Sequence, residues 1–404
     1  MTAHAVEVTG LGVVSSGGLS VQEFGHTIFS GKSTIGDISD RAHGLRYTVG
    51  APVRSFDPQQ YFDEKTLGTL DRFTQFAAVA AREALSQAGL PDSKASPERI
   101  GVIVGTANAG IDILSDGYMR IKEGRKPRPL TVPMTMASAP ASRIAHEVKA
   151  RGPVFGVSSA CASAGHAILV GLMLIRSGII DVAIVGGTDS CFCEGYLMAW
   201  DGLRVVAADT CRPFSVDRQG LVIGEGAAIL VLERADHAAL RGARPLAKLI
   251  GAAMTSDAGD LIAPDPLGMS QAMHRAVTDG GIAVSAVDYI NAHGTGTIAN
   301  DRAEATAIKE LFGSRAKPVA VSSTKSMIGH TMGAAGALEA TATILAIRNG
   351  IIPPTINYRG LDPECDIDVT PNVARNEQIT VALSNSFAFG GLNVCLAFAA
   401  ASVA

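Results

Sequence analysis

The fold is decided by the stretch Val154-Phe-Gly-Val-Ser-Ser-Ala-Cys161-Ala-Ser-Ala-Gly-His166 and the apolar run that follows it. Val154 to Val157 predicts a short strand, and Ala162 to Arg176, apolar on every side, predicts a buried helix of four turns. Cys161 therefore falls at a strand-to-helix turn, where free amides and the helix dipole lower the pKa of a thiol. This placement predicts a nucleophile. The alternative is a small buried hydrophobic residue whose pKa burial would raise.

The composition indicates large buried elements. Hydrophobic residues make up 47% of the 404 residues and charged residues 18%, which excludes a disordered chain and allows two or three domains, or two fused halves of one core. The net charge of −4, without a basic block, argues against a nucleic-acid partner. The N-terminus lacks the pattern of a signal peptide, and the longest apolar run, Ala167 to Ile175, is well short of the roughly 20 residues that span a bilayer. We therefore expect a soluble cytoplasmic protein.

Two other motifs do not predict a cofactor site. The six cysteines contain no C-x-x-C pair, so neither a zinc site nor a disulfide framework is indicated. The segment Gly10-Leu-Gly12 follows a predicted strand, as in dinucleotide-binding loops. However, Ser15 stands where a third glycine is needed, and no acidic residue follows about 20 positions later.

The second half of the chain repeats the order of the first. The clearest parallels pair Val154–Ser159 with Val319–Ser323, Arg99–Gly105 with Val287–Ala292, and Gly224–Glu233 with Phe389–Phe398. Two βαβ-rich halves, residues 1–245 and 246–404, predict a duplicated α/β fold. Such folds bind ligands outside the carboxyl ends of their parallel strands, so Cys161 and two polar loops of the second half should converge there.

These two loops carry the candidate partners of Cys161. Asn291 to Thr297 contains His293, and Ser323 to His330 contains Lys325 and His330. A single histidine after a strand is more often a surface or structural residue. Two histidines in such loops of a duplicated fold, together with the cysteine, predict an active site, since the chain has only nine histidines.

Four motifs in this order resemble those of the decarboxylating, elongating β-ketoacyl-acyl carrier protein synthases: Ser158-Ser-Ala-Cys161-Ala, Asn291-Ala-His293-Gly-Thr-Gly-Thr, Ser323-Thr-Lys325-Ser-Met-Ile-Gly-His330 and Asn385-Ser-Phe-Ala-Phe389-Gly-Gly. The resemblance covers essentially the whole chain. It implies a thiolase-like fold of five αβαβα layers and a homodimer that works without a cofactor on an acyl carrier protein.

The resemblance also implies a role for each catalytic residue. Cys161 would take the acyl chain from its carrier protein, which divides one difficult condensation into two steps. Malonyl-carrier protein would then lose CO2, and His293 and His330 would donate hydrogen bonds to the oxygen of the resulting enolate. The product would be a 3-oxoacyl-carrier protein. Lys325 would act electrostatically, in an ion pair with Glu304 or as part of an ordinary structural pair.

Other residues resemble the substrate-binding positions of that family. The amides of Cys161 and Phe389 would form a second oxyanion hole, and the Phe389 ring would gate the site or only pack in the core. Thr295 and Thr297 match positions that bind the phosphopantetheine arm, although threonines in a turn need no such purpose.

Two substitutions separate the chain from the common pattern. Ala388 replaces a glycine before Phe389, and Leu392 replaces a threonine after the double glycine. Alanine restricts the backbone movement that glycine allows, which concerns the mobility of the gate. The segment Val104 to Gly110 also lacks bulky pocket residues. Condensation is therefore indicated more firmly than primary fatty-acid elongation, because relatives that build nodulation-type acyl chains, aryl polyenes or polyketides share these features.

Several other classes fit less well. A non-catalytic chain-length subunit of a ketosynthase heterodimer would lack Cys161, although the chain could still need such a partner. A thiolase would carry a second cysteine near Phe389, and a priming synthase an asparagine in place of His330. A serine hydrolase using Ser159 or Ser163 would need an acidic partner for its histidine. Acyl specificity would depend on a pocket at the dimer interface, where Ile111 and Met136 are candidates.

Overall fold

A computed structural model describes residues 4–90 and 95–401. The first half contains β1 (Val6–Ser15), α1 (Val21–Ser30), β2 (Gly36–Asp37), β3 (Val49–Gly50), α2 (Glu64–Leu67), α3 (Arg72–Ala88), β4 (Ile100–Gly105), α4 (Ile111–Lys122), α5 (Thr131–Thr135), α6 (Ala139–Val148), β5 (Val154–Val157), α7 (Ser163–Arg176), β6 (Val182–Asp189), α8 (Glu194–Leu203), β7 (Gly226–Arg234) and α9 (Ala235–Leu240). The second half contains β8 (Ala247–Ser256), α10 (Pro266–Asp279), β9 (Tyr289–Asn291), α11 (Ile298–Phe312), β10 (Ala320–Ser322), α12 (Lys325–Ile328), the 3-10 turn η4 (Met332–Ala334), α13 (Ala335–Asn349), β11 (Ile351–Ile352), β12 (Arg375–Asn376), β13 (Val381–Ala388) and β14 (Leu392–Ala400).

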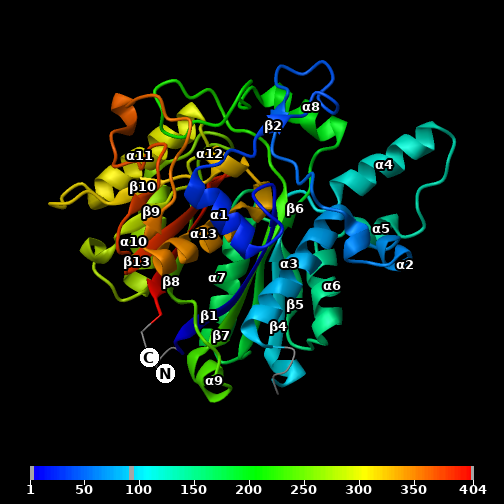
Figure 1. The fold of residues 1–404 in the computed structure, drawn as a ribbon, viewed down its shortest axis with the longest axis horizontal. Coiled ribbons are helices and arrows are strands. Elements are labelled where there is room, and N and C mark those ends of the chain that lie inside the picture. Colours follow the sequence, from blue (N-terminus) through cyan, green and yellow to red (C-terminus); the bar gives the residue numbers. More distant parts are fainter. Residues whose placement is uncertain (1–3, 91–94, 402–404) are drawn as a thin grey trace.

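One sheet runs through the molecule in the order β10-β9-β13-β14-β8-β1-β7-β6-β4-β5 (Figure 1). Its two sets of five strands meet where β1 pairs antiparallel with β8, through Glu7 opposite Lys248 and Val8 opposite Ala247. Read outward from this junction, both sets have the same order. In the first set β4 pairs parallel with both β5 and β6, and in the second set β9 pairs parallel with both β10 and β13. The predicted duplicated α/β fold is confirmed, and the predicted boundary at residue 245 falls just before β8.

Helices complete the five layers. α7 and α13 pack against each other between the two sets of strands, in a buried cluster that includes Leu172, Leu338, Leu230 and Leu396. α3 and α6 cover the outer face of the first set, and α10 and α11 cover that of the second. The buried stretch that predicted a helix at Ala162–Arg176 forms α7, and α13 lies beside it in the central layer. Before α13, Met332 to Ala334 form the 3-10 turn η4.

Some elements differ from the sequence-based expectation. Strands β8 and β13 were not predicted. The residues of β8 show no clear alternation of apolar and polar positions, and β13 contains part of a motif that was interpreted as part of the active site. Residues 111–135 form an arm, made of α4, α5 and the connection between them, that projects from the body (Figure 1). No helix within residues 4–90 or 95–401 has the length and apolar character to cross a bilayer.

The glycines at the start of the chain serve packing. A Cβ atom added to Gly12 would lie 1.8 Å from the carbonyl oxygen of Ala80, and one added to Gly10 would lie 2.1 Å from that of Ala84. Both oxygens belong to α3. This Gly-x-Gly therefore lets α3 contact β1 closely, in agreement with the rejection of a dinucleotide-binding loop.

We expect Gly12→Val to lower the free energy of unfolding by about 3 kcal/mol or more, because helix backbone occupies the space that the new side chain needs. Urea denaturation of the full chain measures this. Gly36→Ala is the matched control, since a Cβ there meets nothing within 4 Å, and it should cost less than about 1 kcal/mol. Equal losses in the two variants would contradict the packing argument.

Candidate active site

The turn that carries Cys161 is stabilised by hydrogen bonds of the Ser163 side chain. Ser163, the first residue of α7, donates its hydroxyl hydrogen to the carbonyl oxygen of Ala160 at 2.6 Å and accepts the amide of Ser159 at 2.9 Å. Ala160 takes a positive φ of 49°, which turns the chain sharply. Cys161 is left with 8% of its surface exposed, next to the start of α7 as the sequence predicted.

Burial dominates the chemistry of this thiol. Desolvation raises the pKa of Cys161 to about 12, and the positive charge of Lys325 opposes this only in part. The expectation that the helix start favours a thiolate is therefore wrong for this state of the protein, because the cost of burying a negative charge exceeds the attraction of the turn. Cys161 therefore carries a neutral thiol in this state.

Glu304 supports the loop that carries His293. Its two carboxylate oxygens accept the amides of His293 and Gly294, each at 2.8 Å, and Asn385 donates to it at 3.2 Å. Glu304 is fully buried on α11, and burial raises its pKa to about 7. Both oxygens are thus occupied by the loop that follows β9.

Lys325 pairs with another residue than predicted. Its ammonium group forms a short ion pair with Glu339 of α13 and donates to the carbonyl oxygen of His293 at 2.5 Å. The predicted pair of Lys325 with Glu304 is wrong, because the amides of the His293 loop occupy Glu304 and α13 brings Glu339 to the lysine. Both members of the pair are 2% exposed, so the charges are compensated inside the core.

Contacts from within the protein define the tautomer of each active-site imidazole. The amide of Met332 donates to Nδ1 of His330 at 3.1 Å, and the ammonium of Lys325 lies 3.2 Å from Nδ1 of His293. A nitrogen that accepts a hydrogen bond carries no hydrogen, so in both neutral rings the hydrogen is on Nε2. Burial, and then the charge of Lys325, hold the pKa of both histidines well below the usual range.

The three predicted residues converge. Cys161, His293 and His330 each offer a side-chain atom within 4.8 Å of the others, and the imidazole rings cross at 84° with centroids 5.4 Å apart. Nε2 of His330 is buried and finds no hydrogen-bond partner within the described chain. One thiol and two imidazoles are residue types that bind zinc. With the hydrogens on Nε2, however, the rings present donors instead of lone pairs, which suits a developing oxyanion better than a cation.

A cavity of about 270 Å³ leads to this cluster. Its lining includes all three catalytic candidates and the predicted substrate-binding residues Thr295, Thr297 and Phe389. The hydroxyls of the two threonines are hydrogen-bonded to each other at 2.8 Å. Sequence reasoning missed much of the remaining wall, because these residues belong to loops and to helices α8 and α11 that carry no motif: Trp200, Arg204, Gln219, Ile262, Pro264 and Ile298.

Phe389 lies at the tip of the β13–β14 hairpin. Its ring stacks on Trp200 with centroids 6.1 Å apart and an angle of 25°. The left-handed positions of the turn are Gly390 and Gly391, with φ of 84° and 67°. Ala388 lies in the regular strand opposite Leu392. The two substitutions therefore leave the observed turn unstrained, because neither replaces a glycine at a position of positive φ.

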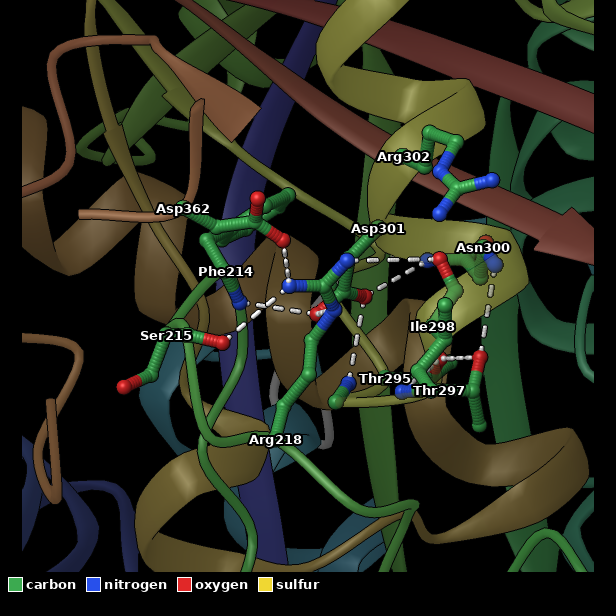
Figure 2. A network of polar contacts seen from close by, with 12 residues as sticks. Phe214, Ser215, Arg218, Thr295, Thr297, Ile298, Asn300, Asp301, Arg302 and Asp362 are labelled. Carbon is green, nitrogen blue, oxygen red and sulfur yellow. Dashed lines mark hydrogen bonds and ion pairs between the residues drawn. The ribbon is translucent and has the colours of Figure 1, made fainter. Parts of the chain in front are cut away.

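A buried ion network braces the turn with the two threonines (Figure 2). Arg218 forms ion pairs with Asp362 and, at 3.7 Å, with Asp301. Asp301 accepts the amide of Gly296 at 3.1 Å and that of Phe214 at 2.7 Å. The backbone between Thr295 and Thr297 is therefore hydrogen-bonded to the buried ion network of Arg218, Asp301 and Asp362.

We expect Arg218→Met to destabilise the protein by about 3–5 kcal/mol, because it leaves the buried Asp301 carboxylate without its cation. Arg302→Met is the control. Arg302 forms an exposed pair with Glu364, so its loss should cost less than about 1 kcal/mol. Urea unfolding compares the two variants, and a similar small cost for both would show that the network does not depend on Arg218.

The site combines a buried thiol at a strand-to-helix turn with two neutral imidazoles close to it. Together with the duplicated five-layer α/β fold, it defines a condensing enzyme of the thiolase type. Family models agree with this class. The model of the β-ketoacyl synthase N-terminal domain matches residues 3–238, and that of the C-terminal domain matches residues 246–359. The chain belongs to the β-ketoacyl synthase family, and it is an acyltransferase that condenses an acyl chain with a malonyl unit on acyl carrier protein.

Individual relatives cover nearly the whole chain. "Nodulation protein E" of Rhizobium sp. (strain N33) is 46% identical over 97% of this chain and 98% of its own. "3-oxoacyl-[acyl-carrier-protein] synthase 2" of Synechocystis sp. is 38% identical over 97% of each chain. Among solved structures, "The ishigamide ketosynthase/chain length factor" superposes with a TM-score of 0.95 at 34% identity, over 99% of this chain and 100% of that one. The retained Cys161 distinguishes the chain from a non-catalytic chain-length subunit.

Proposed function

We propose that Cys161 carries the acyl chain and that His293 and His330 stabilise the enolate that attacks it. The observation that carries this proposal is the convergence of one thiol and two imidazoles on one cavity, with Nδ1 of each imidazole already in contact with a donor inside the protein. In the first step Sγ of Cys161 bonds to the acyl carbonyl carbon, and the carrier thiol leaves with the proton of Cys161. In the second step the malonyl carboxylate leaves as CO2, and the electron pair of the broken bond forms the enolate.

The enolate carbon then bonds to the acyl carbon on Cys161, and the cysteine leaves as a thiolate that regains a proton from solvent. Two N–H donors toward the enolate oxygen lower the barrier to decarboxylation without a proton transfer. Lys325 supports them by keeping Nδ1 of His293 an acceptor, and Glu304 supports them by fixing the loop. Thr295 and Thr297 offer hydroxyls to the phosphopantetheine arm, and Phe389 lies beside the acyl site.

Conversion of an acyl-carrier protein and malonyl-carrier protein into a 3-oxoacyl-carrier protein two carbons longer tests the assignment of Cys161. We expect Cys161→Ala to lose this product completely while it unfolds at the same temperature as the wild type. Mass spectrometry of the carrier-bound products measures this. Cys395→Ala, which removes a buried thiol outside the cavity, should retain activity. Product formation by Cys161→Ala would refute its role.

The role of the histidines is tested by the release of CO2 from malonyl-carrier protein. We expect His293→Ala and His330→Ala each to slow it by on the order of a hundredfold or more, as is typical when an oxyanion donor is lost. His274→Ala, on the exposed face of α10, is the control and should decarboxylate at the wild-type rate. Wild-type rates in both site variants would remove the imidazoles from this step.

We also propose that a second copy of the chain covers the arm. Leu114, Tyr118 and Ile121 lie along one side of α4 and are 57–59% exposed. β5 is an edge strand of the sheet and carries the exposed Phe155, so the same half of the fold also offers a free strand edge to a partner. A chain-length partner of the kind named for the ishigamide structure is the other candidate for this surface.

Sedimentation of the purified chain tests the homodimer. We expect a particle of twice the chain mass of 41.6 kDa, and we expect Tyr118→Glu to shift it toward the monomer, because the charge would be buried without a partner. Leu240→Glu, at a site 88% exposed on α9, is the control and should leave the dimer intact. A monomeric wild type that dimerises only with a chain-length protein would support the heterodimer.

We propose a specialised acyl chain as the substrate, because the identity to nodulation protein E exceeds that to the 3-oxoacyl synthase. Ala107 and Ile111, at the start of the α4 arm, belong to the same hydrophobic cluster as Phe389, so this segment is a candidate for contact with the acyl chain. Comparing initial rates over a panel of acyl-carrier proteins that differ in length and unsaturation will identify the preferred donor.

A further inference from the structure

Asp189, the last residue of β6, forms a buried hydrogen-bond cluster between the two halves of the fold. Its side chain is fully buried and accepts four hydrogen bonds. The donors are the hydroxyl of Thr106 at 2.7 Å and the amides of Ala107 at 2.9 Å, Asn108 at 3.1 Å and Gly333 at 2.6 Å. Three donors follow β4 in the first half, and the fourth belongs to the turn after His330 in the second half.

That second turn determines the state of His330. The amide of Met332 donates to Nδ1 of His330, and Met332 takes a φ of 51°, a conformation that side chains other than glycine rarely adopt. Such a conformation persists only where surrounding contacts impose it. The next residue, Gly333, makes the contact with Asp189, and a Cβ added there would lie 2.3 Å from the amide nitrogen of Ala107. The turn at Met332 and Gly333 is therefore in close contact with the loop after β4 that is hydrogen-bonded to Asp189.

We propose that Asp189 is a positioning residue for decarboxylation: by holding Gly333 it keeps the Met332 amide on Nδ1 of His330 and so keeps the Nε2–H of His330 directed at the malonyl thioester. This inference rests on the proposed role of His330. Only a group with acceptors on both atoms satisfies four donors here. An asparagine would direct its NH2 group at backbone N–H groups and release one side of the cluster.

The proposal predicts different effects on the rates of the two steps of the reaction. Acyl transfer to Cys161 does not use the Nε2–H of His330, whereas decarboxylation does. Loss of Asp189 should therefore slow decarboxylation much more than acylation. A residue that only stabilised the fold would lower both rates together, along with the unfolding temperature.

The experiment compares wild type, Asp189→Asn and Glu233→Gln as full-length proteins. Glu233 is the matched control, since it is a fully buried carboxylate in a separate network with Thr9, His237 and Arg241. Three quantities are measured: the rate of Cys161 acylation, the rate of malonyl decarboxylation, and the 15N chemical shifts of the His330 ring, assigned with His330→Gln. The shifts distinguish a nitrogen with hydrogen from one without.

We expect Asp189→Asn to slow decarboxylation more than tenfold with acylation within about twofold, and to move the His330 shifts away from the pure Nε2–H tautomer. Glu233→Gln should change none of the three. Unchanged His330 shifts in a folded Asp189→Asn, or equal losses in both steps, would overturn the proposal. If Asp189→Asn does not fold, Gly333→Ala replaces it, because the added Cβ displaces the same turn and should give the same split.

The failure of the underlying mechanism is recognised separately. If His330→Ala decarboxylates at the wild-type rate, the role of His330 is refuted, while the 15N shifts still show whether Asp189 sets its tautomer.

Discussion

Each active-site imidazole receives a hydrogen bond on Nδ1 from inside the protein, and the chemistry of the site depends on this constraint. The donor is the ammonium of Lys325 for His293 and the amide of Met332 for His330. Both rings are buried and neutral, so each carries its hydrogen on Nε2, and both lie close to the thiol of Cys161. A pair of fixed N–H dipoles in a desolvated site stabilises a negative oxygen without reorganisation during the reaction.

The duplicated fold supplies the parts that impose this constraint. The two sets of strands bring the loop after β5 of one half and the loops after β9 and β10 of the other to the same edge of the core. The two central helices each contribute to the site. α7 begins two residues after Cys161, and α13 provides Glu339, which pairs with Lys325. Without that carboxylate, the lysine charge would be buried without compensation, at a cost of several kcal/mol.

The fold class and the convergence of Cys161, His293 and His330 could be predicted from the sequence, because both are encoded locally. The apolar stretch after Cys161 and the repeated Val-Ser-Ser reflect the central layer and the duplication, and His293 and His330 lie in motifs of fixed spacing. Ion-pair partners that meet only through packing between distant segments could not be predicted. Glu339 lies in no recognisable motif, and the sequence therefore indicated Glu304 as the partner of Lys325. The sequence also left open whether the turn lowers or burial raises the pKa of Cys161, since the extent of burial is a property of the assembled fold.

The most direct test of the account is the intact mass of the protein after mixing with an acyl-carrier protein, with the modified residue located by tandem mass spectrometry. The account predicts an adduct of one acyl group per chain, carried by Cys161, that disappears when malonyl-carrier protein is added. A folded dimer that forms no adduct with any acyl donor, or an adduct on another residue, would contradict it.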